Sequence, residues 1–390
     1  MNIIFKKEDK DVIERNISLL YKNNLNIDEN YARNIFNNIL ENAIKLNSSD
    51  IHIEPFNDIL LIRMRIDGQL KEVSRFTIDI YPYLSSVIKL DMSMDITERR
   101  LPQDGRVDIN INNKIIDIRA SSIPTVYGEK IVLRILNRDS FLKSKLDLGF
   151  SLDSIEKIKS IISRKSGILL VTGATGSGKT TTVYSLLNDL KNISKNIMTI
   201  EDPVEYKMDG INQIQVNSKY GLNFDVGLRS ILRQDPDIIM VGEIRDLETA
   251  QIAIRAATTG HLVISTMHTK DAISSISRLI EMNIEPYLIN ASLIGVISQK
   301  LVRKLCTKCE GNKEKVCLDC NGDKYSGRTA IYEILEIDED IKCCIQEQRD
   351  IKEILNIAIK NGMITFEDTI HKLISKKITT LEECIIENNI

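Results

Sequence analysis

The amino-acid sequence has no uninterrupted apolar run that approaches the ~18 residues of a membrane-spanning helix. Its first stretch, MNIIFKKEDKDVIERN, turns polar and acidic too early for a secretory signal peptide. Basic residues are not in excess, because 52 Lys and Arg stand against 55 Asp and Glu and give a formal net charge of −3. These absences argue against a membrane-embedded chain, a secreted chain and a chain that grips nucleic acid by charge alone. We therefore expect a cytoplasmic protein without a transmembrane segment.

Cysteine is sparse, with seven copies in 390 residues and no secretory signal before them. Since disulfides are rare in reducing compartments, we interpret these residues as thiols or metal ligands. Internal repeats and low-complexity tracts are absent as well. What remains is an ordinary soluble composition, with 43% hydrophobic and 27% charged residues, in a chain long enough for two or three domains.

The apolar pattern changes near residue 150 and predicts two domains. Residues 1–26 are polar and are interpreted as an N-terminal arm. Residues 27–138 combine one amphipathic helix, YARNIFNNILENAIKL, with short alternating strands and Asp-Gly turns, which favours an antiparallel α+β domain. The stretch 139–150 interrupts the alternation and is the predicted linker.

Residues 151–390 show a different pattern. Continuous apolar strands (GILLVTG, NIMTIED, DIIMVGE and HLVIST) alternate with helical stretches such as LETAQIAIRAATTG. Buried strands separated by helices predict a parallel α/β sheet. The part from 330 to 390, which begins TAIYEILEID, is predicted to be helical and to pack on this core.

The segment VTGATGSGKTTT at 171–182 carries very little side chain before its lysine. Its centre, GATGSGKT, fits the pattern G-x-x-x-x-G-K-[ST] and has a strand before it and a helix after it. Glycines let the backbone wrap an anion with its N–H groups inward, and we expect a Cβ there to crowd the phosphate oxygens. Lys179 then bridges the β- and γ-phosphates, and Thr180 ligates Mg²⁺. The predicted cradle comprises Gly173, Ala174, Thr175, Gly176, Ser177, Gly178, Lys179, Thr180 and Thr181.

Three other predicted strands end on polar residues. Glu201 and Asp202 follow one strand, Glu243 follows another, and His268 follows a third, with His261 at its start. Because the carboxyl ends of parallel strands meet at one sheet edge, we expect these groups near the bound phosphates. Taken singly, each also fits a solvated loop acid or a core histidine.

A zinc knuckle is predicted over 306–320, where CTKCEGNKEKVCLDC contains two C-x-x-C pairs: Cys306 with Cys309 and Cys317 with Cys320. Four thiolates suit tetrahedral Zn²⁺, and because all four protein ligands are filled, we expect a structural metal. A disulfide or redox role is the alternative interpretation.

The combined motifs resemble a known family. GATGSGKTTT, TIEDPVEY, LRQDPDIIMVGEIRD and TGHLVISTMHT look like the Walker A, Asp, Walker B and His boxes of the type II secretion and type IV pilus-assembly ATPases (GspE/PilB-like). Upstream, SSDIHIEP, RMRIDG, RLPQDGRV and RASSIPTVYGEKIVLRIL are similar to that family's second N-terminal domain. The likeness covers roughly residues 45–335. It implies a RecA-like P-loop NTPase domain after a smaller PAS-like domain, in a hexameric ring that holds ATP between the two domains.

The resemblance also implies catalytic roles. Glu201 matches the general base that polarises the attacking water. Glu243 matches the acid that holds Mg²⁺ through water or orients the nucleophile. His268 matches a sensor of the γ-phosphate.

Arginines complete the implied site. Arg119 and Arg134 match N-domain arginines that reach the nucleotide, and Arg229 and Arg233 match interface arginines. His261 is added as a further nucleotide-binding candidate. For each arginine the alternative is a surface ion pair worth ~0–1 kcal/mol.

The resemblance implies a motor that hydrolyses ATP to drive pilus or pseudopilus assembly or type II secretion at the cytoplasmic face of the inner membrane. Only residues 1–26 stand where the family usually has a first domain that docks on a platform protein, so we expect direct engagement of that membrane protein. The cysteine cluster is typical of assembly and secretion members rather than retraction motors. A zinc-containing DNA-translocating or nucleic-acid-binding ATPase and a retraction motor are the alternatives; we expect no nucleic-acid partner.

Overall fold

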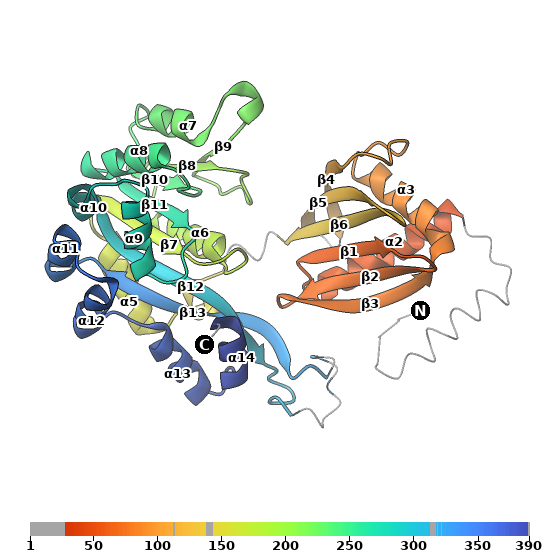
Figure 1. Ribbon diagram of the computed structural model, residues 1–390. Coiled ribbons are helices and arrows are strands. Elements are labelled where there is room, and N and C mark those ends of the chain that lie inside the picture. Colours follow the sequence, from red (N-terminus) through yellow and green to blue (C-terminus); the bar gives the residue numbers. More distant parts are fainter. Residues whose placement is uncertain are drawn as a thin grey trace. The chain divides into compact units, whose positions relative to one another are not determined.

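The computed structural model describes residues 28–111, 114–137, 143–312, 317, 319–320 and 322–388. The chain divides into two compact units, Met1–Arg138 and Asp139–Ile390 (Figure 1). The predicted arm, 1–26, and the first part of the predicted linker lie outside the described residues. Within the described ranges, no helix combines the length and hydropathy that crossing a membrane requires.

The smaller unit is an antiparallel sheet with helices on one face. Its strands follow the order β3-β2-β1-β6-β5-β4. In chain order the elements are α2 (Glu29–Lys45), β1 (Asp50–Pro55), β2 (Ile59–Ile66), β3 (Gln69–Thr77), η1 (Ile78–Ile80), α3 (Tyr81–Asp91), β4 (Gln103–Ile111), β5 (Lys114–Thr125) and β6 (Gly128–Asn137). Strand alternation sends Ile51 and Ile53 into a core shared with α2 and α3, and Asp50 and Glu54 to the other face. The predicted α+β class is confirmed.

The larger unit is built on a seven-stranded sheet of order β13-β12-β7-β11-β10-β8-β9. All neighbours are parallel except β12 and β13, so the predicted largely parallel sheet is confirmed. Its strands are β7 (Gly167–Thr172), β8 (Ile197–Glu201), β9 (Asn212–Gln215), β10 (Ile238–Val241), β11 (Leu262–Met267), β12 (Leu293–Leu305) and β13 (Tyr325–Glu336).

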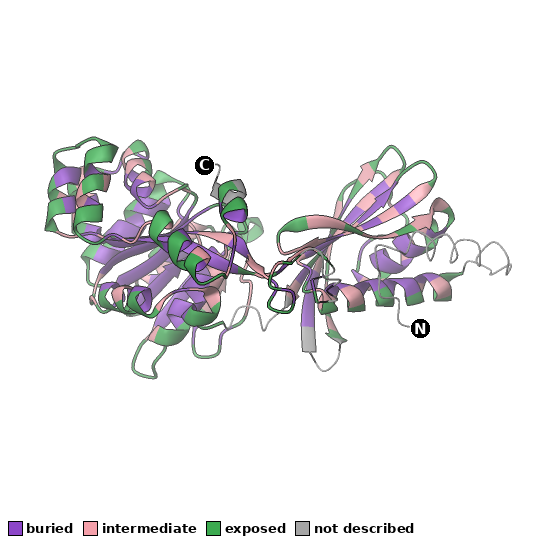
Figure 2. Ribbon diagram, turned by 90° about the horizontal axis from the view of Figure 1, so that it is seen from below, coloured by how far each residue is buried: buried purple, intermediate pink, exposed green. Residues whose placement is uncertain are grey.

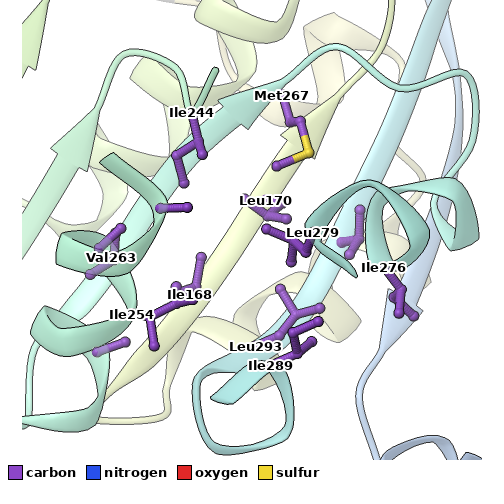
Figure 3. Packing of buried hydrophobic residues seen from close by; sticks show 14 of the residues in the cluster. Ile168, Leu170, Ile244, Ile254, Val263, Met267, Ile276, Leu279, Ile289 and Leu293 are labelled. Atoms are coloured by element: carbon purple, nitrogen blue, oxygen red, sulfur yellow. The ribbon is translucent and has the colours of Figure 1, made fainter. Parts of the chain in front are cut away.

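Helices cover both faces of this sheet. They are α4 (Lys145–Leu148), α5 (Leu152–Ile162), α6 (Lys179–Leu190), η3 (Ser218–Tyr220), α7 (Phe224–Ile231), α8 (Leu247–Thr258), α9 (Ile273–Glu281), α10 (Pro286–Ser292), α11 (Glu339–Gln346), α12 (Ile351–Lys360), α13 (Phe366–Ser375) and α14 (Leu381–Asn388). Ile168 and Leu170 of β7 pack with α8, α9 and α10 (Figure 3). Leu169 and Val171 pack with α5 and α6 on the opposite face. The strands are therefore buried on both sides, as Figure 2 shows, which explains their unbroken apolar runs.

The prediction that 330–390 is helical is wrong for its first residues. Tyr325–Glu336 form β13, which pairs antiparallel with β12 and sets Ile334 opposite Ile297. A short run that is apolar on both faces fits a buried strand or a buried helix equally well by periodicity. The segment forms a strand because pairing with the edge of β12 provides hydrogen-bond partners for the backbone N–H and C=O groups of both strands.

The predicted linker, 139–150, belongs to the larger unit in its second half. Lys145 of α4 is 5% exposed and forms an ion pair with Asp189 of α6. A capping box at Ser144 and a left-handed Gly149 begin and end this short helix. The polar sequence of this segment therefore forms a short helix that packs on the larger unit.

Candidate functional site

The loop after β7 has the geometry of an anion cradle. Gly173, Gly176 and Gly178 all have positive φ, and Gly178 is the N-cap of α6. Ser177 is buried, and its Oγ has no hydrogen-bond partner among the described residues. Backbone N–H groups at a helix N-terminus and an unsatisfied buried hydroxyl fit a phosphate group.

Gly173 is required for a different reason from the expected crowding of phosphate oxygens by a Cβ. A Cβ on Gly173 would lie 2.3 Å from the Gln299 carbonyl oxygen and 2.6 Å from Ser177 Oγ. A side chain at this position is therefore excluded by the protein itself. The space around Gly176 is open, and its φ of 82° alone favours glycine there.

Lys179 is the buried cation of this loop. Its side chain is 8% exposed, and Nζ donates hydrogen bonds to the carbonyl oxygens of Gly173 (2.8 Å) and Ala174 (2.9 Å). Burial lowers the pKa of Lys179 to about 8, while the Glu243 carboxylate opposes that shift. The ammonium thus rests on neutral acceptors of the loop, which a phosphate can replace.

Glu243 connects the groups at the carboxyl ends of the strands. It follows β10, and Thr266 of β11 fixes its turn by donating to the Gly242 carbonyl oxygen (2.6 Å). Glu243 Oε1 lies 2.5 Å from Arg245, and Oε2 lies 3.5 Å from His268 Nε2. Burial, followed by the positive charge of Lys179, lowers the pKa of His268. The structure therefore brings Lys179, Glu243 and His268 together, as the sequence predicted.

Glu201, the residue expected as general base, is held in a buried hydrogen-bond network. It is 3% exposed at the end of β8, and Tyr184 of α6 donates to Oε2. Oε1 accepts from Thr199 (2.6 Å) and from Gln213 (3.2 Å). Burial, followed by the adjacent Glu201 charge, raises the pKa of Tyr184 and keeps the phenol a donor. These three donors fix the orientation of the carboxylate, and since a carboxylate can accept about four hydrogen bonds, one acceptor position is left.

His261 is not brought to this site. It precedes β11 at the amino end, whereas the phosphate loop follows the carboxyl end of the parallel β7. Its Nδ1 lies 2.8 Å from the Ala256 carbonyl oxygen and 3.2 Å from Thr259 Oγ1, at the end of α8. The histidine contacts the C-terminal end of this helix and is only partly buried, so it is not the core histidine considered as its alternative.

The two arginines on and after α7 also have partners away from the phosphate loop. Arg229 pairs with Glu248 at 2.9 Å. Arg233 donates to the Arg229 carbonyl oxygen (3.0 Å) and to Ser230 Oγ (3.2 Å). Both are exposed.

Arg119 and Arg134 lie on neighbouring strands of the smaller unit, directly opposite each other in β5 and β6. Arg134 Nε donates to Asp50 at 3.1 Å, and its side chain is 64% exposed. Arg119 lies 4.0 Å from Asp117. The two arginines and their carboxylate partners lie on the sheet face opposite the helices.

The four knuckle cysteines form a compact buried cluster. All four sulfurs lie within 4.8 Å of one another, and Cys306–Cys317 and Cys309–Cys320 are each 3.7 Å apart. A Zn–S bond of ~2.3 Å in a tetrahedron places sulfurs ~3.8 Å apart, whereas a disulfide requires ~2.05 Å. The spacing fits one tetrahedral ion and excludes the disulfide alternative in this state.

Three residues of the site escaped the sequence interpretation. Arg245 stands two positions after Glu243, a spacing that could have drawn attention. Tyr184 and Gln299 gave no local signal, because their contacts with Glu201 and the phosphate loop exist only in the folded chain.

A phosphate loop and an acid and histidine at adjacent strand ends of a largely parallel sheet define the class: this is a P-loop ATP hydrolase. The chain belongs to the type II/IV secretion system protein family, whose model matches residues 26–386.

Relatives support that placement. The chain is 44% identical to the type II secretion system protein HxcR of Pseudomonas aeruginosa, over 90% of this chain and 76% of that protein. It is 45% identical to the type IV pilus assembly ATPase PilB of Thermus thermophilus, over 93% of this chain but only 43% of that longer protein. A crystal structure of the pilus retraction motor PilT with bound ADP has a TM-score of 0.67 at 29% identity, covering 89% of this chain and 95% of that one.

Proposed function

We propose that this protein is a motor ATPase that hydrolyses Mg·ATP to power the assembly of a type IV pilus or pseudopilus, or type II secretion. The observation that carries the proposal is the convergence of Lys179, Glu243 and His268 on the cradle at 173–181. Relatives at 44–45% identity are named for secretion or pilus assembly, which favours those outputs over retraction.

In this proposal, the loop and the first turn of α6 bind the nucleotide phosphates. Backbone N–H groups of the cradle donate hydrogen bonds to the phosphate oxygens, and Lys179 exchanges its two carbonyl acceptors for phosphate oxygens. Thr180 and, through water, Glu243 are the residues that would hold Mg²⁺, which neutralises charge on the transferred phosphoryl group. Glu243 Oε2 is buried without a hydrogen-bond partner among the described residues, which suits this ligand role.

Hydrolysis then needs a base and a positioned water. We assign water activation to Glu243, whose Oε2 faces His268, and sensing of the γ-phosphate to His268. Glu201 acts through Tyr184 and Gln213 as a positioning residue. We assign to Arg119 and Arg134 of the smaller unit the further positive charge that the nucleotide needs, and to Arg229 and Arg233 contacts between copies of the chain.

The cysteine cluster holds Zn²⁺ in this proposal. Four buried sulfurs at tetrahedral spacing leave no open coordination position, so the ion stabilises the end of the β12–β13 hairpin and takes no part in hydrolysis.

Assembly and location complete the proposal. We infer a homohexamer in the cytoplasm, recruited to the inner membrane by a platform protein of the machine. Arg229 and Arg233 are exposed and therefore accessible to a second copy of the chain. Family membership supports this arrangement.

The proposal is tested by steady-state ATP turnover of matched variants. Lys179→Ala is paired with Lys165→Ala, an exposed lysine before β7, and Glu243→Gln with Glu281→Gln, an exposed acid of α9. Loss of the buried cation or of the base is expected to lower kcat about a hundredfold or more. The two controls keep wild-type turnover. Wild-type turnover in either site variant would end the proposal.

A further inference from the structure

Gln299 occupies an unusual place in the sheet. It lies on β12 immediately after Ser298, which is level with Thr172, the last residue of β7. The residue is 1% exposed, although its carboxamide is polar. A buried carboxamide is retained at a cost unless its hydrogen bonds are made, so its partners indicate its role.

Both ends of the carboxamide contact the phosphate-binding segment. Nε2 donates to the Ser177 carbonyl oxygen at 2.7 Å. Oε1 accepts from Thr182 Oγ1, also at 2.7 Å, in the first turn of α6. The side chain therefore joins the loop to the helix that follows it, from a strand more than a hundred residues away in the sequence.

Gln299 also restricts which side chains fit at two glycine positions of the loop. Its carbonyl oxygen occupies the space in which a Gly173 Cβ would stand, at 2.3 Å, and its Nε2 lies 3.1 Å from the Cβ position of Gly178. The loop is thus packed against this one residue as well as hydrogen-bonded to it.

The contact with Ser177 fixes a peptide plane. The Ser177–Gly178 bond is trans, and in a trans peptide the C=O and the N–H point in opposite directions. Because Gln299 holds the Ser177 C=O on the β12 side, the Gly178 N–H is turned away from β12. That N–H is one of the donors at the N-terminus of α6.

We propose that Gln299 is a positioning residue that sets the Ser177–Gly178 peptide so that the Gly178 N–H faces the phosphates of the nucleotide. The inference rests on the proposed function, since it concerns the same nucleotide site. It makes the conformation of the loop depend on β12, the strand that leads to Cys306. Gln299 itself does not touch the nucleotide.

The test compares binding of Mg·ADP and turnover of Mg·ATP in full-length variants. Gln299→Ala removes both contacts, and Gln299→Glu keeps the size and the acceptor for Thr182 while losing the donor to Ser177. Asn290→Ala is the matched control, because Asn290 is also a carboxamide that ties two elements, α10 and α11, by donating to the Lys342 carbonyl oxygen (2.9 Å). Thr182→Val tests the same network if Gln299→Ala does not fold.

We expect Gln299→Ala and Gln299→Glu to raise the Kd for Mg·ADP and the KM for ATP about three- to tenfold, with kcat within about twofold, because the contact serves ground state and transition state alike. Thr182→Val shifts both constants in the same direction by less. Asn290→Ala lowers the melting temperature without moving either constant.

Two results would overturn the inference and show a packing role. One is wild-type Kd and KM in Gln299→Glu when both constants are raised in Gln299→Ala. The other is a lower melting temperature in both variants with no change in either constant. If Lys179→Ala abolishes binding while the Gln299 variants bind like wild type, the inference fails and the proposed function stands. If the wild-type protein binds no Mg·ADP, both fail together.

Discussion

Glu333 offers a sharp prediction about pH and stability. It lies on β13, is 8% exposed, and accepts a hydrogen bond from the Ala272 amide N–H at 2.8 Å, at the start of α9. Burial raises the pKa of Glu333 to about 7; the nearby Asp271 carboxylate adds to this shift, while the amide donors and Lys300 oppose it. The perturbation is Glu333→Gln, a neutral side chain of the same size that can still accept from Ala272.

The sign follows from proton binding. Between the ordinary Glu pKa of 4.5 and about 7, the folded chain holds a proton on Glu333 that the unfolded chain has lost. Stability therefore falls as pH rises through this window and is level above it. A shift of about 2.5 pKa units corresponds to about 3 kcal/mol. We therefore expect the effect of Glu333→Gln on the free energy of unfolding to be more favourable at pH 8 than at pH 4.5 by about 1–3 kcal/mol, because the neutral side chain avoids the cost of ionising a buried carboxyl group.

Urea denaturation at several pH values between 4.5 and 8 measures this difference. The chain has no tryptophan, so far-UV circular dichroism is the signal, and the transition of the larger unit is the relevant one. Glu281→Gln, at an exposed position of α9, is the control. Wild-type and Glu333→Gln free energies of unfolding that run parallel across the whole pH range would refute the reasoning.

The remaining predictions concern the cysteine cluster and Glu201. Cys306→Ser, or chelation of the metal, is expected to lower the melting temperature of the larger unit by about 5–10 °C, whereas Cys343→Ser, an exposed thiol outside the cluster, leaves it unchanged. Unchanged melting after complete zinc removal would contradict a structural metal. Glu201→Gln is expected to destabilise the protein by about 1–3 kcal/mol, because its amide group meets a donor. A wild-type unfolding free energy in that variant would count against the three-donor network.

Local patterns in the sequence identify the parts of the site that follow one another along the chain. The phosphate loop, the strand before it and the helix after it are contiguous, so their spacing alone predicts the cradle and Lys179. Glu243 and His268 were predicted for a different reason: each follows a buried strand, and parallel strands bring their carboxyl ends to one edge of the sheet.

The features that the sequence does not report depend on tertiary contacts. Glu201 lies in the segment TIED, but its hydrogen bonds with Tyr184 and Gln213 form only in the folded chain. β13 became a strand because β12 offered an edge. Gln299 acts on a loop far away in the sequence, which no periodicity reports.

The most direct test of the account is a calorimetric titration of the folded, full-length protein with ADP in the presence of Mg²⁺. The account predicts saturable binding at one site per chain, abolished by Lys179→Ala and retained by Lys165→Ala. No heat of binding in the wild-type protein, or equal binding in the Lys179→Ala variant, would contradict it.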